Sequence, residues 1–94
     1  MIKIVEQEIE EYLKGFSKRD ITMKLDGTII AEIKIINAKC FYKRNVGILE
    51  IGNGQIKFEF NTSFLYQMGI KEDGRKLNMF FDNGIDLIIE KDRF

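Results

Sequence analysis

The sequence predicts an α+β fold that is mostly β: an amphipathic helix over about residues 2–15, then an antiparallel meander over about residues 20–91. Two observations carry this prediction. Apolar residues recur every three or four positions at the start of the chain and every second position from Ile21 onward. Short turns containing glycine then separate the alternating segments into six or seven strands. Because such a sheet twists and has one apolar face, we expect a small roll or partly open barrel in which the helix covers one face or plugs one end.

The helix prediction rests on one apolar stripe with charged residues on the other side. Acidic residues lie toward its start and Lys14 toward its end, as the helix dipole prefers. We expect Gly15 to end the helix in the left-handed conformation and the next residue to pack back on the last turn. The stripe consists of Ile2, Val5, Ile9, either Tyr12 or Leu13, and Phe16.

The first predicted hairpin turns at Asp26-Gly27. A two-residue loop would put its strands out of phase, whereas a three-residue loop keeps their apolar faces together. We therefore predict the longer loop, which pairs Leu25 with Ile29 and Met23 with Ala31.

Three further turns predict the remaining hairpins. Asn53-Gly54 suits a type I′ turn, since both residues tolerate positive φ. Asp73-Gly74 and the three-residue loop Asp82-Asn83-Gly84 follow the same logic. The predicted pairs are Ile51–Ile56, Leu49–Phe58 and Glu50–Lys57 at the first turn, Ile70–Leu77, Met68–Met79, Tyr66–Phe81 and Glu72–Arg75 at the second, and Phe81–Ile85, Met79–Leu87 and Leu77–Ile89 at the third.

The same patterns predict the sheet edges. We expect residues 21–25 and 85–90 to be edge strands and residues 55–60 to be internal. Asn61-Thr62-Ser63 suits the start of a helical turn through Met68, ended by Gly69. We prefer a strand over residues 64–71, because the pairing downstream is coherent.

Length, charge and cysteine content bound the class of protein. The 94 residues fit one domain, 1–94, and 15 basic residues balance 15 acidic ones, so no long-range field favours polyanions. The single cysteine, Cys40, and the absence of an apparent signal peptide or long apolar run predict a cytoplasmic protein with no membrane partner. Ile and Lys are frequent, and because their codons are rich in A and T, this usage suggests an AT-rich bacterial or phage genome.

A helix leading into strands joined by Leu25-Asp26-Gly27 is similar to the start of Sm-like barrels. Because this common turn alone carries the resemblance, we assign no family and transfer no residue roles.

Catalytic machinery is not visible in the sequence. Histidine, the commonest general base and metal ligand, is absent. Cys40 lies in an apolar-aromatic stretch with no accompanying base, which favours a structural thiol. The carboxylates fall on a solvated helix face and at hairpin tips, without the spacing of a calcium loop. We therefore expect a protein that is not an enzyme and has no catalytic residue, metal site or cofactor.

One stretch suggests a binding site: the basic-aromatic patch of Lys39, Phe41, Tyr42, Lys43 and Arg44. Single-stranded nucleic-acid binders stack bases on aromatic side chains and hold phosphates with cations, often on small β-barrels. The alternative interpretation is an irregular strand with Phe41 in the core and solvated cations at its end.

Some apolar residues fall on the second face of the predicted sheet, where either the helix, the curling sheet or a partner would cover them. Together with unpaired strand edges, they favour a small non-catalytic protein-binding module, such as a regulator or inhibitor, whose partner is another protein or its own copy in a homodimer. The alternative function is nucleic-acid binding by residues 39–44. The second-face residues are Ile30, Ile36, Ile48, Phe80 and Ile88.

Overall fold

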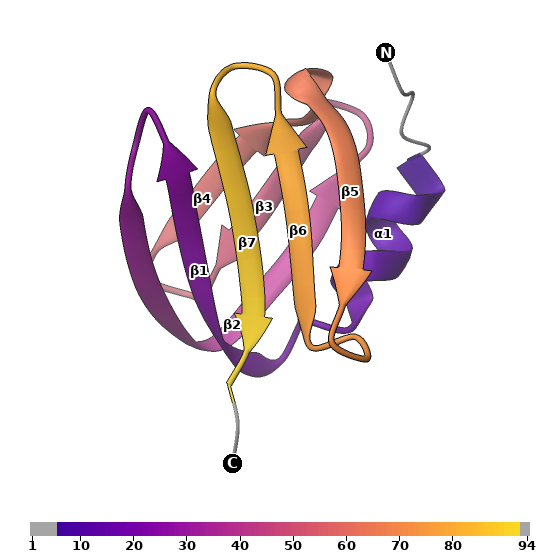
Figure 1. The fold of residues 1–94 in the computed structure, drawn as a ribbon. Helices are drawn as coiled ribbons and strands as arrows, with labels where there is room; N and C mark the ends of the chain where they lie inside the picture. The colour runs from indigo at the N-terminus through magenta and orange to yellow at the C-terminus, as the bar shows by residue number, and fades with distance from the viewer. Residues whose placement is uncertain (1–5, 93–94) are drawn as a thin grey trace.

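The computed structural model describes residues 6–92 and contains one helix followed by seven antiparallel strands in a single open sheet, which confirms the predicted fold class (Figure 1). Ile2 and Val5 of the predicted helical stripe lie outside the described residues. The elements are α1 (Glu6–Lys14), β1 (Arg19–Gly27), β2 (Ala31–Lys43), β3 (Ile48–Gly52), β4 (Lys57–Asn61), β5 (Leu65–Lys71), β6 (Lys76–Phe81) and β7 (Ile85–Lys91), with a 3-10 turn, η1 (Thr62–Phe64), before β5.

The strand order is β4-β3-β2-β1-β7-β6-β5, so β1 and β7 pair at the centre of the sheet and β4 and β5 form its ends. The predicted edges at residues 21–25 and 85–90, and the predicted internal position of residues 55–60, are therefore wrong. Met23 pairs with Ile89 and Leu25 with Leu87, and this pairing buries apolar side chains of both strands. Hairpin signals report only neighbours in the chain, and these two strands are far apart in sequence.

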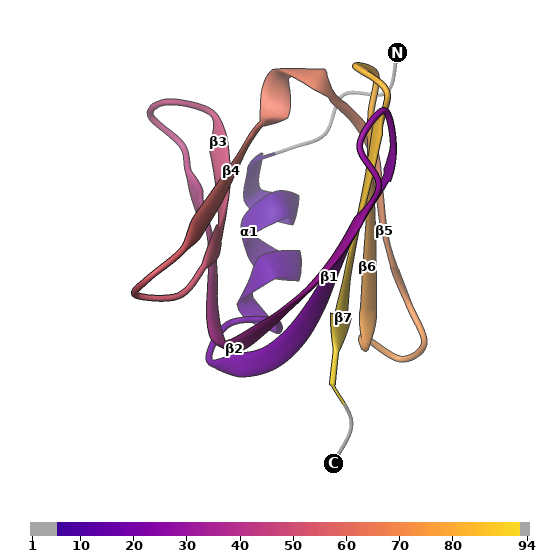
Figure 2. The same ribbon diagram turned by 90° about the vertical axis from the view of Figure 1, so that its left-hand side faces the viewer.

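The long strand β2 bends and belongs to two layers. Its first part, residues 31–35, pairs with β1, and its second part, residues 39–43, pairs with β3. At the bend Asn37 has a φ of 52°, and its N–H donates to Oδ1 of Asp20 at 3.0 Å. Asn tolerates the left-handed region better than most residues, so the sequence suits the bend. The sheet is thereby folded into a layer of β1, β7, β6 and β5 facing a layer of β2, β3 and β4 (Figure 2).

Helix α1 lies between the two layers, where it buries its apolar side (Figure 2). Ile9 and Leu13 are buried, and so is Phe16 just after the helix. Gly15 does not adopt the predicted left-handed conformation; Lys18 does, with a φ of 62°. The reason is that the chain turns later, where the N–H of Lys18 donates to the Ala38 carbonyl at 2.7 Å and leads into β1.

The core joins α1 to both layers. None of the buried residues that the structure describes is polar or charged. Of the predicted second-face residues, Ile36 on β2 is 54% exposed and Ile30, which lies just before β2, is 82% exposed, so neither the helix nor the sheet covers them. The core consists of Ile9, Leu13, Phe16, Ile21, Met23, Ile35, Ala38, Cys40, Leu49, Ile51, Leu65, Leu77, Met79, Phe81, Leu87 and Ile89.

The two hairpins at the C-terminal end follow the predicted registers, with one exception. All three pairs predicted across Asp82-Asn83-Gly84 are present. Across Asp73-Gly74 the Ile70–Leu77 and Met68–Met79 pairs are present, and Glu72 contacts Arg75 at 3.2 Å. An irregularity between Leu65 and Gln67 places Leu65, not Tyr66, opposite Phe81.

The first hairpin is shifted by two residues from its prediction. Leu25 pairs with Ala31 and Met23 with Ile33, so each strand still turns the predicted face inward. The loop is longer because β1 continues to Gly27, which pairs with Ile85 of β7.

The hairpin at Asn53-Gly54 is shifted in the same way, with Ile51 opposite Phe58 and Leu49 opposite Phe60. Its loop is wider than a type I′ turn because the Asn53 side chain accepts the N–H groups of residues 55 and 56, at 2.9 and 3.2 Å. Glu50 therefore faces Glu59 instead of the predicted Lys57, which remains a diagonal neighbour at 3.9 Å.

The segment after β4 combines both predicted alternatives. The Asn61 side chain accepts the N–H of Ser63 at 2.9 Å and caps the single 3-10 turn η1. The chain then becomes extended at Leu65, so the preferred strand is confirmed and the helical turn ends well before Met68.

Gly27 provides a test of how β1 meets the β6–β7 turn. Its φ is 134°, and a Cβ there would lie 2.1 Å from the Gly84 carbonyl oxygen. We expect Gly27→Ala to lower the free energy of unfolding by about 2 kcal/mol or more, measured by urea denaturation. Gly69→Ala is the control, since a methyl group there would meet no atom within 4 Å and the φ of Gly69 is outside the left-handed range. Equal stability of the two variants would contradict this close approach.

Candidate functional site

The basic-aromatic patch does not gather on one surface. Phe41 lies on the outer face of β2 and is 43% exposed, whereas Tyr42 points inward and packs against the core. The Tyr42 hydroxyl donates to Oε2 of Glu6 at 3.0 Å and lies 3.4 Å from the Thr62 hydroxyl. The two predicted aromatics therefore cannot form one stacking platform, because consecutive residues of a strand point to opposite faces. The alternative that placed Phe41 in the core is also wrong.

Two of the three cations in the patch are held by carboxylates. Nζ of Lys43 lies 2.8 Å from Oε1 of Glu50 and 3.6 Å from Oε2 of Glu59, and bridges these two facing acids. Arg44 donates to both carboxylate oxygens of Glu10, at 2.9 and 2.7 Å. The hydrogen bond to Glu50 raises the pKa of Lys43, and the one to Glu10 raises the pKa of Arg44. In residues 6–92, Lys39 is the one cation of the patch without such an ion pair.

A groove of about 260 Å³ lies between α1 and the second part of β2. There the edge of β2 opposite β3 is capped by a side chain: the Ser17 hydroxyl donates to the Cys40 carbonyl at 2.8 Å and accepts the Cys40 N–H at 2.9 Å. A strand could not add at this point without displacing Ser17. The groove is lined by Glu10, Leu13, Lys14, Ser17, Cys40, Phe41 and Tyr42.

Cys40 belongs to the hydrophobic core. Its side chain is buried, and Sγ lies 3.7 Å from the Phe16 carbonyl oxygen. Burial raises the pKa of the Cys40 thiol from 9.0 to about 12. The reactive thiolate is therefore scarce in the folded protein near neutral pH.

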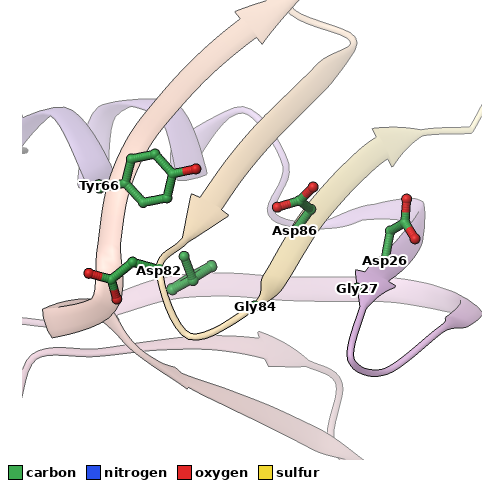
Figure 3. Close-up of a pocket in the computed structure, with 7 residues that line it drawn as sticks. Asp26, Gly27, Tyr66, Asp82, Gly84 and Asp86 are labelled. Atoms are coloured by element: carbon green, nitrogen blue, oxygen red, sulfur yellow. The ribbon is translucent and has the colours of Figure 1, made fainter.

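A second pocket, of about 480 Å³, lies where the β1 end meets the β6–β7 turn (Figure 3). Asp26 and Asp86 face each other across β1 and β7, while Asp82 lies at the turn and Tyr66 comes from β5. Among residues 6–92, no three acidic or Cys side chains lie close enough together to hold a metal ion. Sequence analysis placed Asp26 and Asp82 at separate hairpin turns and Asp86 in a strand, because the β1–β7 pairing that joins them has no local signal.

The third surface is an unpaired strand edge, which we call the β2 edge: the side of residues 31–36 that faces away from β1. Because β3 pairs with β2 only from Lys39 onward, no strand in the described part of the chain covers this side. At its far end the Ile36 carbonyl accepts the side-chain amide of Asn53 at 3.5 Å, the limit of hydrogen-bond distance. Exposed Ile29 and Ile30 lie just before it. Sequence reasoning placed the free edges elsewhere and missed this one.

Comparison with protein-family models, curated proteins and solved structures gave no match. No helix within residues 6–92 has the length and apolar character needed to cross a membrane.

The buried thiol gives a prediction about reactivity. We expect Cys40 in the folded protein to resist alkylation by iodoacetamide at pH 8, and to react quickly once denaturant unfolds the chain. Mass spectrometry of the adduct over time measures both rates. Rapid modification under native conditions would contradict the burial of this thiol.

The same raised pKa predicts a pH dependence of stability. Above about pH 9 the unfolded chain loses the Cys40 proton while the folded chain keeps it until about pH 12, so the free energy of unfolding falls as pH rises through this range. Other groups also titrate there, and Cys40→Ala is the control because it removes only the thiol contribution. We expect the alkaline loss of stability to be smaller in this variant, measured by urea denaturation at pH 8 and pH 10; equal losses would contradict it.

Proposed function

We propose that this protein is a small non-catalytic protein-binding module, acting as a regulator or inhibitor, and that it binds a partner strand along the β2 edge. The observation that supports this most is the coincidence of an unpaired backbone edge with exposed apolar side chains. Ile30 lies just before the edge and Ile36 lies at its far end, and they are 82% and 54% exposed. An exposed edge of this kind offers hydrogen bonds to an added strand, and its side chains supply specificity.

The direction of the backbone groups supports the proposal. The Ile36 carbonyl points away from β1 toward Asn53, while the N–H of Asn37 points to Asp20 of β1. Because the N–H and C=O of a strand residue lie on the same side and alternate along the strand, those of Glu32 and Lys34 also point away from β1. A partner strand would therefore find a regular row of donors and acceptors.

Nucleic-acid binding is the weaker alternative. Its proposed residues put their aromatics on opposite faces of β2, and two of the three cations already bind carboxylates. Recruiting Lys43 or Arg44 to a phosphate would break an existing ion pair, which lowers the gain from each contact.

The proposal is tested by purifying a tagged chain from its native host with and without nuclease treatment. We expect one protein to co-purify in stoichiometric amount and to survive nuclease. Lys34→Pro removes an outward N–H of the β2 edge, and should reduce the recovered partner about tenfold through the lost hydrogen bond.

Lys34→Ala is the matched control, because both variants lose the ion pair between Lys34 and Asp92 at 3.0 Å and only the proline removes the N–H. Thermal unfolding monitored by circular dichroism confirms that both variants are folded. Equal recovery with the two variants would overturn binding at the β2 edge. Recovery of nucleic acid alone, lost on substituting Lys39 and Arg44, would favour the alternative function.

A further inference from the structure

We propose that the strand bound at the β2 edge is the same strand of a second copy of this chain, paired antiparallel with its two-fold axis at Ile33. The inference rests on the proposed function, since it uses the surface assigned there, and it adds the identity and register of the partner. In this register residue n of one copy lies opposite residue 66 − n of the other, so that Ile33 lies opposite Ile33.

The charges along the edge are complementary in this register. Glu32 of one copy faces Lys34 of the other, and the two-fold axis repeats the pair, so two opposite-charge pairs form. Both side chains are exposed on the outer face of the sheet. Directly opposed charges of opposite sign stabilise an antiparallel pair, and like charges destabilise it.

The apolar residues match as well. Ile30 of one copy faces Ile36 of the other on the outer face, again twice, and these are the side chains left exposed at the two ends of the edge. Ile33 faces its own copy at the axis. In this register each apolar side chain of the row therefore lies opposite an apolar one, and each charged side chain lies opposite one of the other sign.

The outward direction of the backbone N–H and C=O groups of alternate residues limits which pairing registers are possible. Since Glu32, Lys34 and Ile36 direct their N–H and C=O groups outward, an added copy must place even-numbered residues opposite even-numbered residues. Centring the axis on Glu32 satisfies this rule but sets Glu32 against itself, and centring it on Lys34 sets Lys34 against itself. Among these three registers, the one centred on Ile33 alone pairs opposite charges.

The surroundings of the edge are compatible with this arrangement. In Figure 1 the first part of β2 runs along the outer margin of its layer beside β1. Asp92 of the same chain lies 3.0 Å from Nζ of Lys34, so this cation would lie between Asp92 and the second copy's Glu32. Asn53, at the Ile36 carbonyl, marks where the pairing ends.

Charge reversal tests the register. We expect the wild-type chain to be a dimer at high micromolar concentration, measured by sedimentation equilibrium. Glu32→Lys and Lys34→Glu should each weaken self-association by about tenfold or more, because each variant sets like charges opposite each other twice. Mixing the two single variants should restore a dimer that contains one of each, and the double variant should self-associate like the wild type.

Matched controls make the same charge changes away from the edge: Glu11→Lys on α1 and Lys39→Glu in the second part of β2. Both residues are exposed, and we expect these variants to remain dimeric. Each edge variant also changes a contact within its own chain: Lys34→Glu removes the ion pair with Asp92, and Glu32→Lys sets a lysine opposite Lys24 of β1. The mixed and double variants therefore carry the test of the register. Circular dichroism confirms that every variant is folded.

The outcomes separate this inference from the proposed function. A wild-type monomer at high micromolar concentration, a dimer insensitive to both edge variants, or a failure of the mixed variants to associate would each overturn the self-paired register. If the chain is monomeric but Lys34→Pro still abolishes capture of another protein, the proposed function stands and this inference fails. If the charge-dependent dimer forms and no other protein is captured, self-association is the one binding activity supported.

Discussion

The bend of β2 at Asn37 is the constraint on which the rest of the structure depends. A straight strand of 13 residues would continue one flat layer, and α1 would then cover only one side of it. The bend instead turns residues 39–43 back over the first layer, and the space between the layers is filled by Leu13 of α1 and by Phe16 just after the helix. The hydrogen bond from the Asn37 N–H to Asp20 holds β1 and β2 together where the regular register is interrupted. Apolar burial in both layers thus requires this one backbone irregularity.

Among the strands that the structure describes, none pairs with one side of β2 along residues 31–36 or with the opposite side along residues 39–43, and these two sides differ in what covers them. Along residues 39–43 the free side lies against α1, and the Ser17 hydroxyl satisfies both backbone groups of Cys40. Along residues 31–36 the free side faces outward, and within residues 6–92 its backbone is engaged at the far end alone, by Asn53. The bend therefore leaves the free side of residues 39–43 covered by α1 and Ser17 and the free side of residues 31–36 exposed. The exposed Ile29, Ile30 and Ile36 lie beside the exposed stretch.

Sequence patterns predicted what is local and failed where distant segments meet. The alternation of apolar residues identified the inward faces correctly even where the register slipped, because a shift of two residues preserves the face. Asn53-Gly54 misled since the Asn53 side chain stabilises a wider loop. The pairing of β1 with β7, the capture of Arg44 by Glu10 and the meeting of Asp26 with Asp86 all join residues distant in the chain. No spacing or composition signal reports such contacts, so the patch at residues 39–44 looked cationic in sequence and is largely neutralised in the fold.

The central pairing of β1 with β7 has a consequence for how the chain reaches this structure. During synthesis β1 emerges early, yet β7, one of its two neighbours, is the last of the seven strands to be made. The Thr22 hydroxyl likewise cannot form its hydrogen bond until Asp92, 70 positions later, has been synthesised. Until β7 is available, β1 has an unpaired edge in the partly folded chain. Contacts of such long separation slow folding, and exposed strand margins favour aggregation. The nascent chain is therefore most vulnerable just before β7 is released, when six of the seven strands already exist and the sheet is still split at its centre.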